Sequence, residues 1–391
     1  LRVLGFACKN GAFGEDNLVF LGLAGMMDPP RGEVPAAVTR CKKAGITPVM
    51  ITGDHRETAF AVARRLGIAD SAAQVVTGEQ LERMSGAELR KTVERCRVYA
   101  RVSPKHKSMI VEALQSKGNV VAMTGDGIND APSIKKADIG IAMGVSGTDV
   151  TKNASDMIIS DDNFATIVLA VGEGRRIFSN IKKTIAFFLA TNLAEVLSIF
   201  IVSVLFCRFD FLLSAQLLWL NLVTDSFPVL ALGMERAEPD IMERKPKRAE
   251  KAVFSKESVL SMCFFGGAIT VITLAVFFVS LALFGNATAT TMTFFTLSFA
   301  ELFHAFNIRS DRQSVFRTGI FSNKALLLTV IGGIAVNIAV YAAAPLKAAL
   351  GISALTVWQW VAVFLSALAV IPLGEIYKFF LRRRLRKKGE E

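Results

Sequence analysis

The chain has 391 residues, a length typical of two or three domains. Hydrophobic residues make up 52% of it and charged residues only 20%, whereas a water-soluble globular protein carries about 25% charged residues. This composition excludes a disordered protein and favours membrane-spanning segments. The net charge of +11 is compatible with nucleic-acid binding. However, two basic runs, at 244–251 and 382–388, lie beside apolar stretches, which favours positive flanks of membrane helices. We therefore expect no nucleic-acid partner.

Up to about residue 175, short apolar runs alternate with amphipathic segments. Strands are predicted at 47–52, 98–102, 119–124, 139–143 and 157–160, and helices at 57–66 and 104–116. Continuous apolar strands that alternate with helices indicate a parallel sheet covered on both faces. The first half is therefore predicted to be an α/β domain.

After about residue 175 the chain becomes a series of long apolar stretches. A helix needs roughly 20 apolar residues to span a bilayer, and six such spans are predicted, at 184–206, 212–234, 259–284, 290–307, 325–344 and 355–379. The loop after the second span, the loop at 308–324 and the tail are rich in Lys and Arg, whereas the opposite loops carry only Arg208 and Lys347. This asymmetry predicts that the α/β domain and the C-terminus face the cytosol.

Two weak signals lie where open α/β sheets bind their ligands, at strand ends and helix starts. Thr52-Gly53-Asp54 follows the first predicted strand and offers a hydroxyl and backbone N–H groups to an anion such as phosphate. An ordinary turn explains this pattern equally well. Lys107 lies in the first turn of the helix predicted at 104–116, where a cation is unfavourable unless it faces an anion. On this signal alone, a solvated surface lysine is the simpler interpretation.

The strongest motif is Thr124-Gly125-Asp126-Gly127-Ile128-Asn129-Asp130, directly after a predicted strand. Glycines allow close approach, and carboxylates are hard oxygen ligands suited to Mg²⁺. Asn129 can donate to a phosphate oxygen. Asp126 and Asp130 would repel each other without a cation or a basic partner, so a plain turn is a poor explanation.

Three segments then occur in order, MITGDHRETA, RVSPKHKSMIVEALQ and MTGDGINDAPSIKKADIGIAMG, and apolar stretches follow them. This arrangement resembles the phosphorylation domain of P-type cation-transporting ATPases, a haloacid-dehalogenase-like domain with a Rossmann-like parallel sheet. Asp28-Pro29-Pro30-Arg31 is similar to the stretch where the family's nucleotide-binding domain rejoins that domain.

The resemblance implies a role for each matching residue. Asp126 would hold Mg²⁺, and Asp130 would support the Mg²⁺ and the geometry of its loop. Asp54 belongs to the same matching segment as Thr52 and is taken as part of the catalytic set. The residues expected to contact the phosphoryl group transferred from ATP are Thr52, Gly53, Lys107 and Asn129.

The chain also departs from the family pattern. The phosphorylated Asp of the family lies in an Asp-Lys-Thr-Gly-Thr sequence, which does not occur here. The dephosphorylating Thr-Gly-Glu loop is also missing. The chain is therefore expected to be a C-terminal portion that is inactive alone and has the N-terminal remainder of the same pump as its partner.

Ionisable groups lie deep within three of the predicted spans. Burying an Asp at the centre of a membrane helix costs at least about 2.5–3.5 kcal/mol, so such groups are functional candidates. Glu195 follows Asn192 by three residues; Asn221, Thr224 and Asp225 share one helical face; and Glu301 lies in the fourth span. Pro228 cannot donate to the carbonyl of Thr224, which is thereby freed.

All of these donors are oxygens. Ca²⁺ prefers six to eight oxygen ligands, whereas softer metals prefer sulfur or imidazole, so the set favours Ca²⁺. Polar groups that only hold helices together are the simpler explanation for one Asn or Thr, but not for three acids. His304, one turn after Glu301, is expected to be a packing residue.

The membrane half adds to the resemblance. NLAEV and NLVTDSFPVLALGME are similar to the fifth and sixth helices of endoplasmic-reticulum-type Ca²⁺-ATPases, and AELFHAFN to the eighth. The resemblance implies that six residues bind the transported Ca²⁺, namely Asn192, Glu195, Asn221, Thr224, Asp225 and Glu301.

The predicted organisation has five parts: 1–30, the end of a nucleotide-binding domain; 31–162, the phosphorylation domain; 163–183, a stalk; 184–379, six membrane helices; and 380–391, a basic cytosolic tail. The predicted function is that of the C-terminal part of an ATP-driven Ca²⁺ pump, an integral protein more typical of a bacterial plasma membrane than of a reticulum. Two alternatives stay open: a membrane-anchored phosphatase of the haloacid-dehalogenase superfamily, and a non-catalytic cation-binding membrane module.

Overall fold

A computed structural model describes residues 2–9, 11, 14–15, 18–26, 29–206, 209, 211–246, 255–310 and 313–388. The chain forms two compact units. An α/β unit comprises Leu1–Gly172 and Pro239–Pro246, and a helical unit comprises Glu173–Glu238 and Lys247–Glu391. Asp28, Arg208 and most of the basic run after the second predicted span lie outside the described residues.

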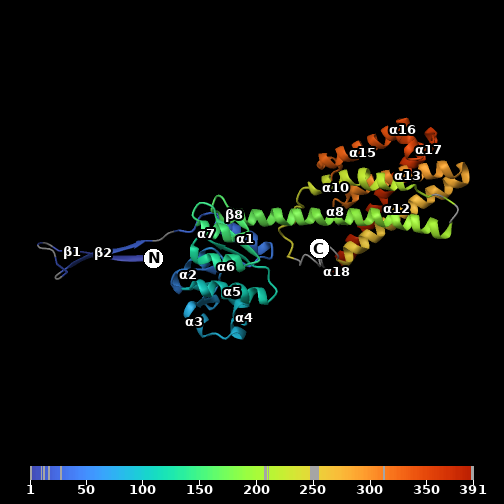
Figure 1. The fold of residues 1–391 in the computed structure, drawn as a ribbon. Coiled ribbons are helices and arrows are strands. Elements are labelled where there is room, and N and C mark those ends of the chain that lie inside the picture. The colour runs from blue at the N-terminus through green and yellow to red at the C-terminus, as the bar shows by residue number, and fades with distance from the viewer. Residues whose placement is uncertain are drawn as a thin grey trace. The chain divides into compact units, whose positions relative to one another are not determined.

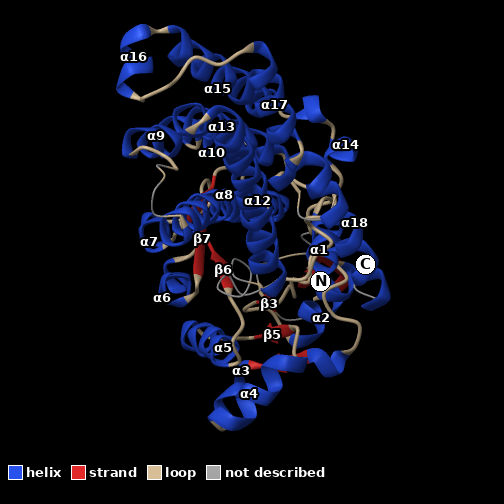
Figure 2. Cartoon of the chain, turned by 90° about the vertical axis from the view of Figure 1, so that its right-hand side faces the viewer, coloured by secondary structure: helices blue, strands red, loops and turns tan. Residues whose placement is uncertain are grey.

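Two three-stranded parallel sheets form the centre of the α/β unit (Figure 2). The first has the order β3-β5-β4, made of Met50–Ile51, Val98–Ala100 and Val75–Thr77. The second has the order β6-β7-β8, made of Ala122–Gly125, Ile139–Met143 and Met157–Ile159. All strand pairs within both sheets are parallel, as the continuous apolar runs of the sequence predict.

Helices cover the first sheet on both faces. Alanines of α2 pack with Val75 and Val98 on one side, and α3, α4 and α5 form a second cluster around Tyr99 on the other. The helices of this unit are α1 (Val34–Lys43), α2 (Arg56–Arg65), α3 (Gly78–Arg83), α4 (Gly86–Arg95), α5 (Pro104–Ser116), α6 (Ala131–Lys136) and α7 (Asp149–Ala154), with 3₁₀ turns η1 (Ala72–Gln74) and η2 (Ile128–Asp130). The α/β prediction is confirmed.

The first predicted strand is shorter in the structure than in the prediction. The sequence predicts a strand over 47–52, but β3 contains only Met50 and Ile51. Pro48 has no N–H to contribute to a sheet ladder, which shortens the strand at its start. By contrast, the helix predicted at 104–116 coincides with α5, because Pro104 lies in its first turn and Gly118 ends the segment with φ near +78°.

Two further parts belong to the α/β unit. A hairpin pairs β1 (Arg2–Cys8) antiparallel with β2 (Val19–Met26). The segment Pro239–Pro246 packs on α1 through Met242, which joins a cluster with Ala37, Cys41 and Val168.

The helical unit contains long apolar helices, drawn in green to red in Figure 1. They are α8 (Phe164–Leu205), α9 (Ser214–Trp219), α10 (Ser226–Gly233), α12 (Lys256–Phe284), α13 (Asn286–Ile308), α15 (Lys324–Ala342), α17 (Val357–Leu368) and α18 (Val370–Lys388). Short elements join them: α14 (Val315–Thr318), η4 (Ile320–Ser322) and α16 (Ala344–Ala349). Helix α8 begins in residues of the α/β unit and ends in the helical unit, and the unit boundary at Gly172 falls within the predicted stalk.

Five of the described helices are long and apolar enough to cross a membrane: Phe164–Leu205, Ser214–Gly233, Lys256–Phe284, Lys324–Ala342 and Val357–Arg384. The sequence predicts a sixth span at 290–307, and this segment is helical in α13 but does not meet that criterion. Every residue from Ala289 to Ile308 is buried inside the helical unit. A helix surrounded by other helices need not be apolar, because its Thr, Ser and acidic side chains face protein.

The second apolar stretch is not one regular helix. Between α9 and α10 lies η3 (Leu220–Thr224), a π-helical segment in which the N–H of Asp225 donates to the carbonyl of Leu220 at 3.0 Å. The sequence predicts that Pro228 interrupts the helical hydrogen bonds here by freeing the carbonyl of Thr224. In the structure the irregular helical turn, η3, comes before the proline. Wider turns of this kind are frequent at functional sites.

Candidate functional site

The loop after β3 is held by hydrogen bonds to the end of β5. The N–H of Thr52 donates to the carbonyl of Tyr99 at 2.9 Å, and its hydroxyl donates to Oδ2 of Asp54 at 2.9 Å. The N–H of Asp54 in turn donates to that hydroxyl at 3.1 Å. A side chain at Gly53 would meet no atom within 4 Å, so the loop has open space at its tip. The arrangement leaves the Gly53 backbone accessible to an anion.

Lys107 is not a solvated surface lysine. Its ammonium forms an ion pair with the carboxylate of Asp130, and the two side chains are only 19% and 9% exposed. The N–H of Gly127 also points at this carboxylate, at 3.5 Å. The simpler interpretation of Lys107 is therefore wrong, and the basic partner that the sequence requires for the motif is this lysine.

Asp126 lies in the same loop but in different surroundings. Its backbone carbonyl accepts from the N–H of Thr148 at 3.0 Å and from the hydroxyl of Thr151 at 3.3 Å. Its side chain is exposed, and none of the described residues donates a hydrogen bond to its carboxylate. This exposed carboxylate fits Mg²⁺, which is usually bound by one or two carboxylates together with substrate phosphates. Asn129 is also exposed.

The start of α5 depends on a residue that sequence reasoning missed. Nδ1 of His106 accepts from the N–H of Ser103 at 3.1 Å, and its Nε2 lies 3.4 Å from a carboxylate oxygen of Glu82. His106 is 4% exposed. The ring therefore closes the first turn of α5, directly before Lys107. A Ser three residues before a His is the only local signal of this cap.

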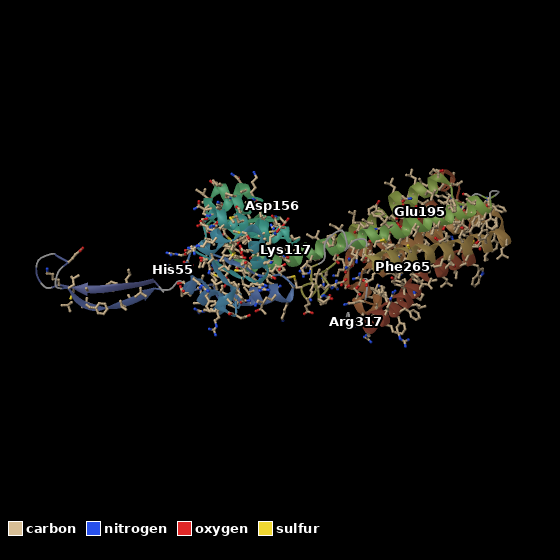
Figure 3. All side chains as sticks on the ribbon, turned by 90° about the horizontal axis from the view of Figure 1, so that it is seen from below. His55, Lys117, Asp156, Glu195, Phe265 and Arg317 are labelled. Atoms are coloured by element: carbon tan, nitrogen blue, oxygen red, sulfur yellow. The ribbon has the colours of Figure 1, made fainter. Side chains whose placement is uncertain are left out.

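Three of the buried acidic side chains of the helical unit lie within the spans predicted from the sequence: Glu195 on α8, Asp225 between η3 and α10, and Glu301 on α13. Their exposed fractions are 4%, 0% and 0%. Figure 3 places Glu195 on α8 within this unit.

Hydrogen bonds join some of the predicted ligands. Asn221 donates from Nδ2 to Oε2 of Glu195 at 2.9 Å, and the hydroxyl of Thr224 lies 3.2 Å from that of Ser298. Asn192 instead donates to the carbonyl of Phe188 on its own helix. The contacts therefore join Asn221 with Glu195, and η3 with α13, but do not join Asn192 to the acids.

Several carboxylate oxygens have no hydrogen-bond partner among the described residues. They are Oε1 of Glu195, Oδ1 of Asp225 and both oxygens of Glu301. Buried polar atoms are nearly always paired, so these four oxygens are of the kind that a cation would satisfy. In the described part of the chain, however, no three His, Cys, Asp or Glu side chains are grouped closely enough to hold a metal ion.

Thr191 and Ser298 are polar partners that the sequence alone did not single out. The hydroxyl of Thr191 donates to Oδ2 of Asp225 at 2.9 Å, across 34 positions of sequence. Thr191 precedes Glu195 by one helical turn, and Ser298 precedes Glu301 by nearly one turn. In the sequence, the only sign of these two partners is their spacing of three or four residues from an acid on the same helix.

His304 is a packing residue in this structure. It is fully buried, and its ring lies 5.9 Å from that of Phe187 in a stacked arrangement and 4.5 Å from that of Phe265. This agrees with the expectation from the sequence.

Two models of known protein families match parts of this chain. Residues 9–138 match the family model of haloacid dehalogenase-like hydrolases, and residues 209–380 match the model of the C-terminus of cation-transporting ATPases. In sequence, the chain corresponds to the hydrolase-like domain and the C-terminal membrane portion of a P-type pump. Together with the five described helices that are long and apolar enough to cross a membrane, this similarity supports an integral membrane protein.

The similar proteins are named as calcium-transporting ATPases. The chain is 43% identical to calcium-transporting ATPase 1 of Bacillus cereus over 97% of its length, and 40% identical to calcium-transporting ATPase 1 of Schizosaccharomyces pombe over 98%. It is 36% identical to calcium-transporting ATPase 3, endoplasmic reticulum-type, of Arabidopsis thaliana over 98%. It spans 45%, 43% and 42% of these proteins, less than half of each.

Proposed function

We propose that this chain is the C-terminal part of an ATP-driven pump that moves Ca²⁺ across a membrane. ATP would phosphorylate an Asp in the N-terminal remainder of the protein, and the state of that phosphate would control the occupancy of the cation site. The observation that carries the proposal is the set of four partnerless carboxylate oxygens on three neighbouring helices. The similarity to proteins named as calcium-transporting ATPases supports it.

In the α/β unit, we assign contact with the phosphoryl group to Thr52, Gly53, Lys107 and Asn129. Phosphoryl transfer depends on positioning and charge neutralisation, and the unit supplies both. Asp54 holds the hydroxyl of Thr52, and Asp130 holds the ammonium of Lys107. Asp126 would bind Mg²⁺, which when bound neutralises charge on the phosphate oxygens.

In the helical unit, Ca²⁺ would be the transported substrate. Its proposed ligands are Asn192, Glu195, Asn221, Thr224, Asp225 and Glu301. All of them supply oxygen, which suits Ca²⁺ better than soft metals. Because the three acids do not converge on one point in this structure, we propose that the side chains close around the ion when it binds. Helix α8 is the covalent link between the phosphoryl and cation sites.

The remaining assignments follow from the same proposal. The five-part domain division of the sequence, with 163–183 as a stalk, is proposed for the complete pump. The basic loops would face the cytosol. A bacterial plasma membrane is the proposed location, and a close relation to the endoplasmic-reticulum-type subfamily is supported by the motifs of η3 and α10. This chain alone would hydrolyse no ATP, because it lacks the Asp-Lys-Thr-Gly-Thr nucleophile.

Two measurements on the full-length protein test the proposal. Asp126→Asn should abolish formation of the phosphoenzyme from radiolabelled ATP, and Glu195→Gln should remove Ca²⁺-dependent ATP hydrolysis while the protein still folds. A normal phosphoenzyme level in Asp126→Asn contradicts the role of the α/β unit. Phosphatase turnover without bound cation would favour the membrane-anchored phosphatase, and Ca²⁺ binding without any phosphoenzyme would favour the non-catalytic module.

A further inference from the structure

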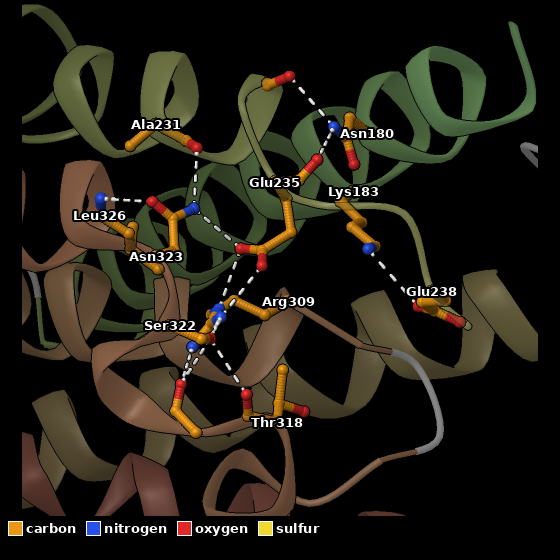
Figure 4. A network of polar contacts seen from close by, with 12 residues as sticks. Asn180, Lys183, Ala231, Glu235, Glu238, Arg309, Thr318, Ser322, Asn323 and Leu326 are labelled. Carbon is orange, nitrogen blue, oxygen red and sulfur yellow. Dashed lines mark hydrogen bonds and ion pairs between the residues drawn. The ribbon is translucent and has the colours of Figure 1, made fainter. Parts of the chain in front are cut away.

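A second polar cluster lies in the helical unit, where α10 and α13 end and α15 begins (Figure 4). Its centre is a two-point ion pair in which Nε and Nη2 of Arg309 donate to the two carboxylate oxygens of Glu235, both at 2.9 Å. Its other members are Asn180, Ser322 and Asn323, and we call these five residues the polar clasp. None of the five belongs to the sites predicted from the sequence.

The clasp connects the ends of three helices, α10, α13 and α15, with the interior of a fourth, α8. Arg309 directly follows α13, and Glu235 lies just beyond α10. Asn323 caps α15 by accepting from the N–H of Leu326, and it donates to both Oε2 of Glu235 and the carbonyl of Ala231. Asn180 on α8 donates to the carbonyls of Gly233 and Glu235, at 3.0 and 2.8 Å.

The ion pair is almost fully enclosed. The side chains of Arg309 and Glu235 are 1% and 7% exposed. Arg309 also donates to the carbonyl of Gly319 at 2.8 Å and to the hydroxyl of Ser322. A buried ion pair is weak grounds for inferring stability, because well-packed apolar residues often replace it without loss. Unlike apolar residues, however, such a pair bonds only in one geometry. It therefore fixes the relative orientation and register of the helices that it joins.

Three of the four joined helices carry the buried acids. Counted along the helices at 1.5 Å per residue, the clasp lies about 12 Å from Glu301, about 15 Å from Asp225 and about 22 Å from Glu195. Asp225 also adjoins the π segment η3, so the direction of α10 is set at one end by η3 and at the other by the clasp. A shift of any one helix at the clasp therefore displaces its acid relative to the other two.

We propose that Glu235 and Arg309 are positioning residues for cation binding: the clasp holds α8, α10 and α13 in the register that lets Glu195, Asp225 and Glu301 share one divalent cation. The inference rests on the proposed function. It makes Glu235 and Arg309 determinants of cation affinity without contact to the ion.

The test measures ATP hydrolysis by the full-length protein as a function of Ca²⁺ concentration. Glu235→Gln keeps the size of the side chain and removes its charge. The double variant Glu235→Met with Arg309→Met removes both charges together. Each should raise the half-maximal Ca²⁺ concentration about tenfold, the lower end of the losses seen when groups that support metal ligands are removed. The maximal rate at saturating Ca²⁺ should stay within about twofold of the unchanged protein, since the α/β unit is untouched.

Two further variants separate positioning from folding. Arg309→Lys keeps a charge on Glu235 but loses the two-point geometry, so it should give an intermediate shift. Glu375→Gln is the matched control. Oε1 of Glu375 accepts from the N–H of Val315 at 2.7 Å, which links the connection between α13 and α15 to α18. Helix α18 carries none of the three acids. It should leave the Ca²⁺ dependence unchanged.

The outcomes are distinct. Folded clasp variants with an unchanged half-maximal Ca²⁺ concentration would overturn the positioning role and leave the proposed function standing. An equal shift in Glu375→Gln would also overturn it. If the unchanged full-length protein shows no Ca²⁺-dependent hydrolysis, the proposed function fails, and the inference fails with it.

Discussion

Gly125 and Gly127 flank Asp126, and the structure predicts opposite results for the same substitution at the two positions. A Cβ on Gly125 would lie 2.7 Å from Oδ2 and 2.8 Å from Cγ of Asp130, closer than real Cβ contacts. A Cβ on Gly127 would lie 3.9 Å from Oδ2 of the same residue, an ordinary contact. Neither glycine has a positive φ. We therefore expect Gly125→Ala to damage this loop and Gly127→Ala to be tolerated.

The magnitude follows from the crowding. Asp130 is 9% exposed at its side chain and pairs with Lys107, so it cannot move without opening the ion pair. Overpacking of this kind costs about 1–3 kcal/mol. For a domain of this size, each kcal/mol lowers the unfolding temperature by about 2–4 °C. Gly125→Ala should therefore lower the unfolding temperature of the α/β unit by roughly 2 to 12 °C, and Gly127→Ala by less than about 2 °C.

Scanning calorimetry of the purified chain in detergent measures these shifts. Hydrogen exchange of peptides from β6 and α5 identifies the transition that belongs to the α/β unit. Equal shifts for the two variants, or an unchanged unfolding temperature in Gly125→Ala, would refute the role of Gly125 as space for Asp130.

Three other predictions follow from particular contacts. The N–H groups of Val145, at 3.0 Å, and Ser146, at 2.7 Å, lower the pKa of Asp162 to about 2. The carboxylate of Asp162 therefore stabilises the fold above the unfolded pKa of about 4, and this contribution disappears as the pH falls to about 2. Asp162→Asn should be less stable than the unchanged protein at neutral pH, and the stabilities of the two proteins should become equal near pH 2. Thr191→Val removes the hydrogen bond to Asp225 and should raise the half-maximal Ca²⁺ concentration of the full-length protein roughly tenfold. Thr273→Val, which loses only a bond to its own helix, should not. Gly266→Ala should lower the unfolding temperature in detergent, because its Cβ would meet Leu193 and the Ala190 carbonyl of α8 at 2.9 and 3.0 Å, whereas the Cβ of Gly267→Ala would meet no atom within 4 Å, and this variant serves as the control.

Much of the architecture could be predicted from the sequence because its causes are local. Helix α5 begins at Pro104 and strand β7 coincides with an apolar run, since turn chemistry and hydrophobic pattern act over a few residues. The lengths of the apolar stretches determine the membrane helices for the same reason. The motif after β6 identified Asp126 and Asp130 as candidates, because the carboxyl ends of parallel strands are where such sheets bind ligands.

The tertiary structure alone decided which distant side chains meet. Thr191 reaches Asp225 across 34 positions, and Arg309 reaches Glu235 across 74. No local pattern contains these pairs, because they depend on the packing of helices that are far apart in the chain. The same packing buries α13, whose Thr, Ser and Glu residues lower its hydropathy while its neighbours remove it from lipid. Sequence determines what each helix is made of, and packing determines which of its polar groups find a partner.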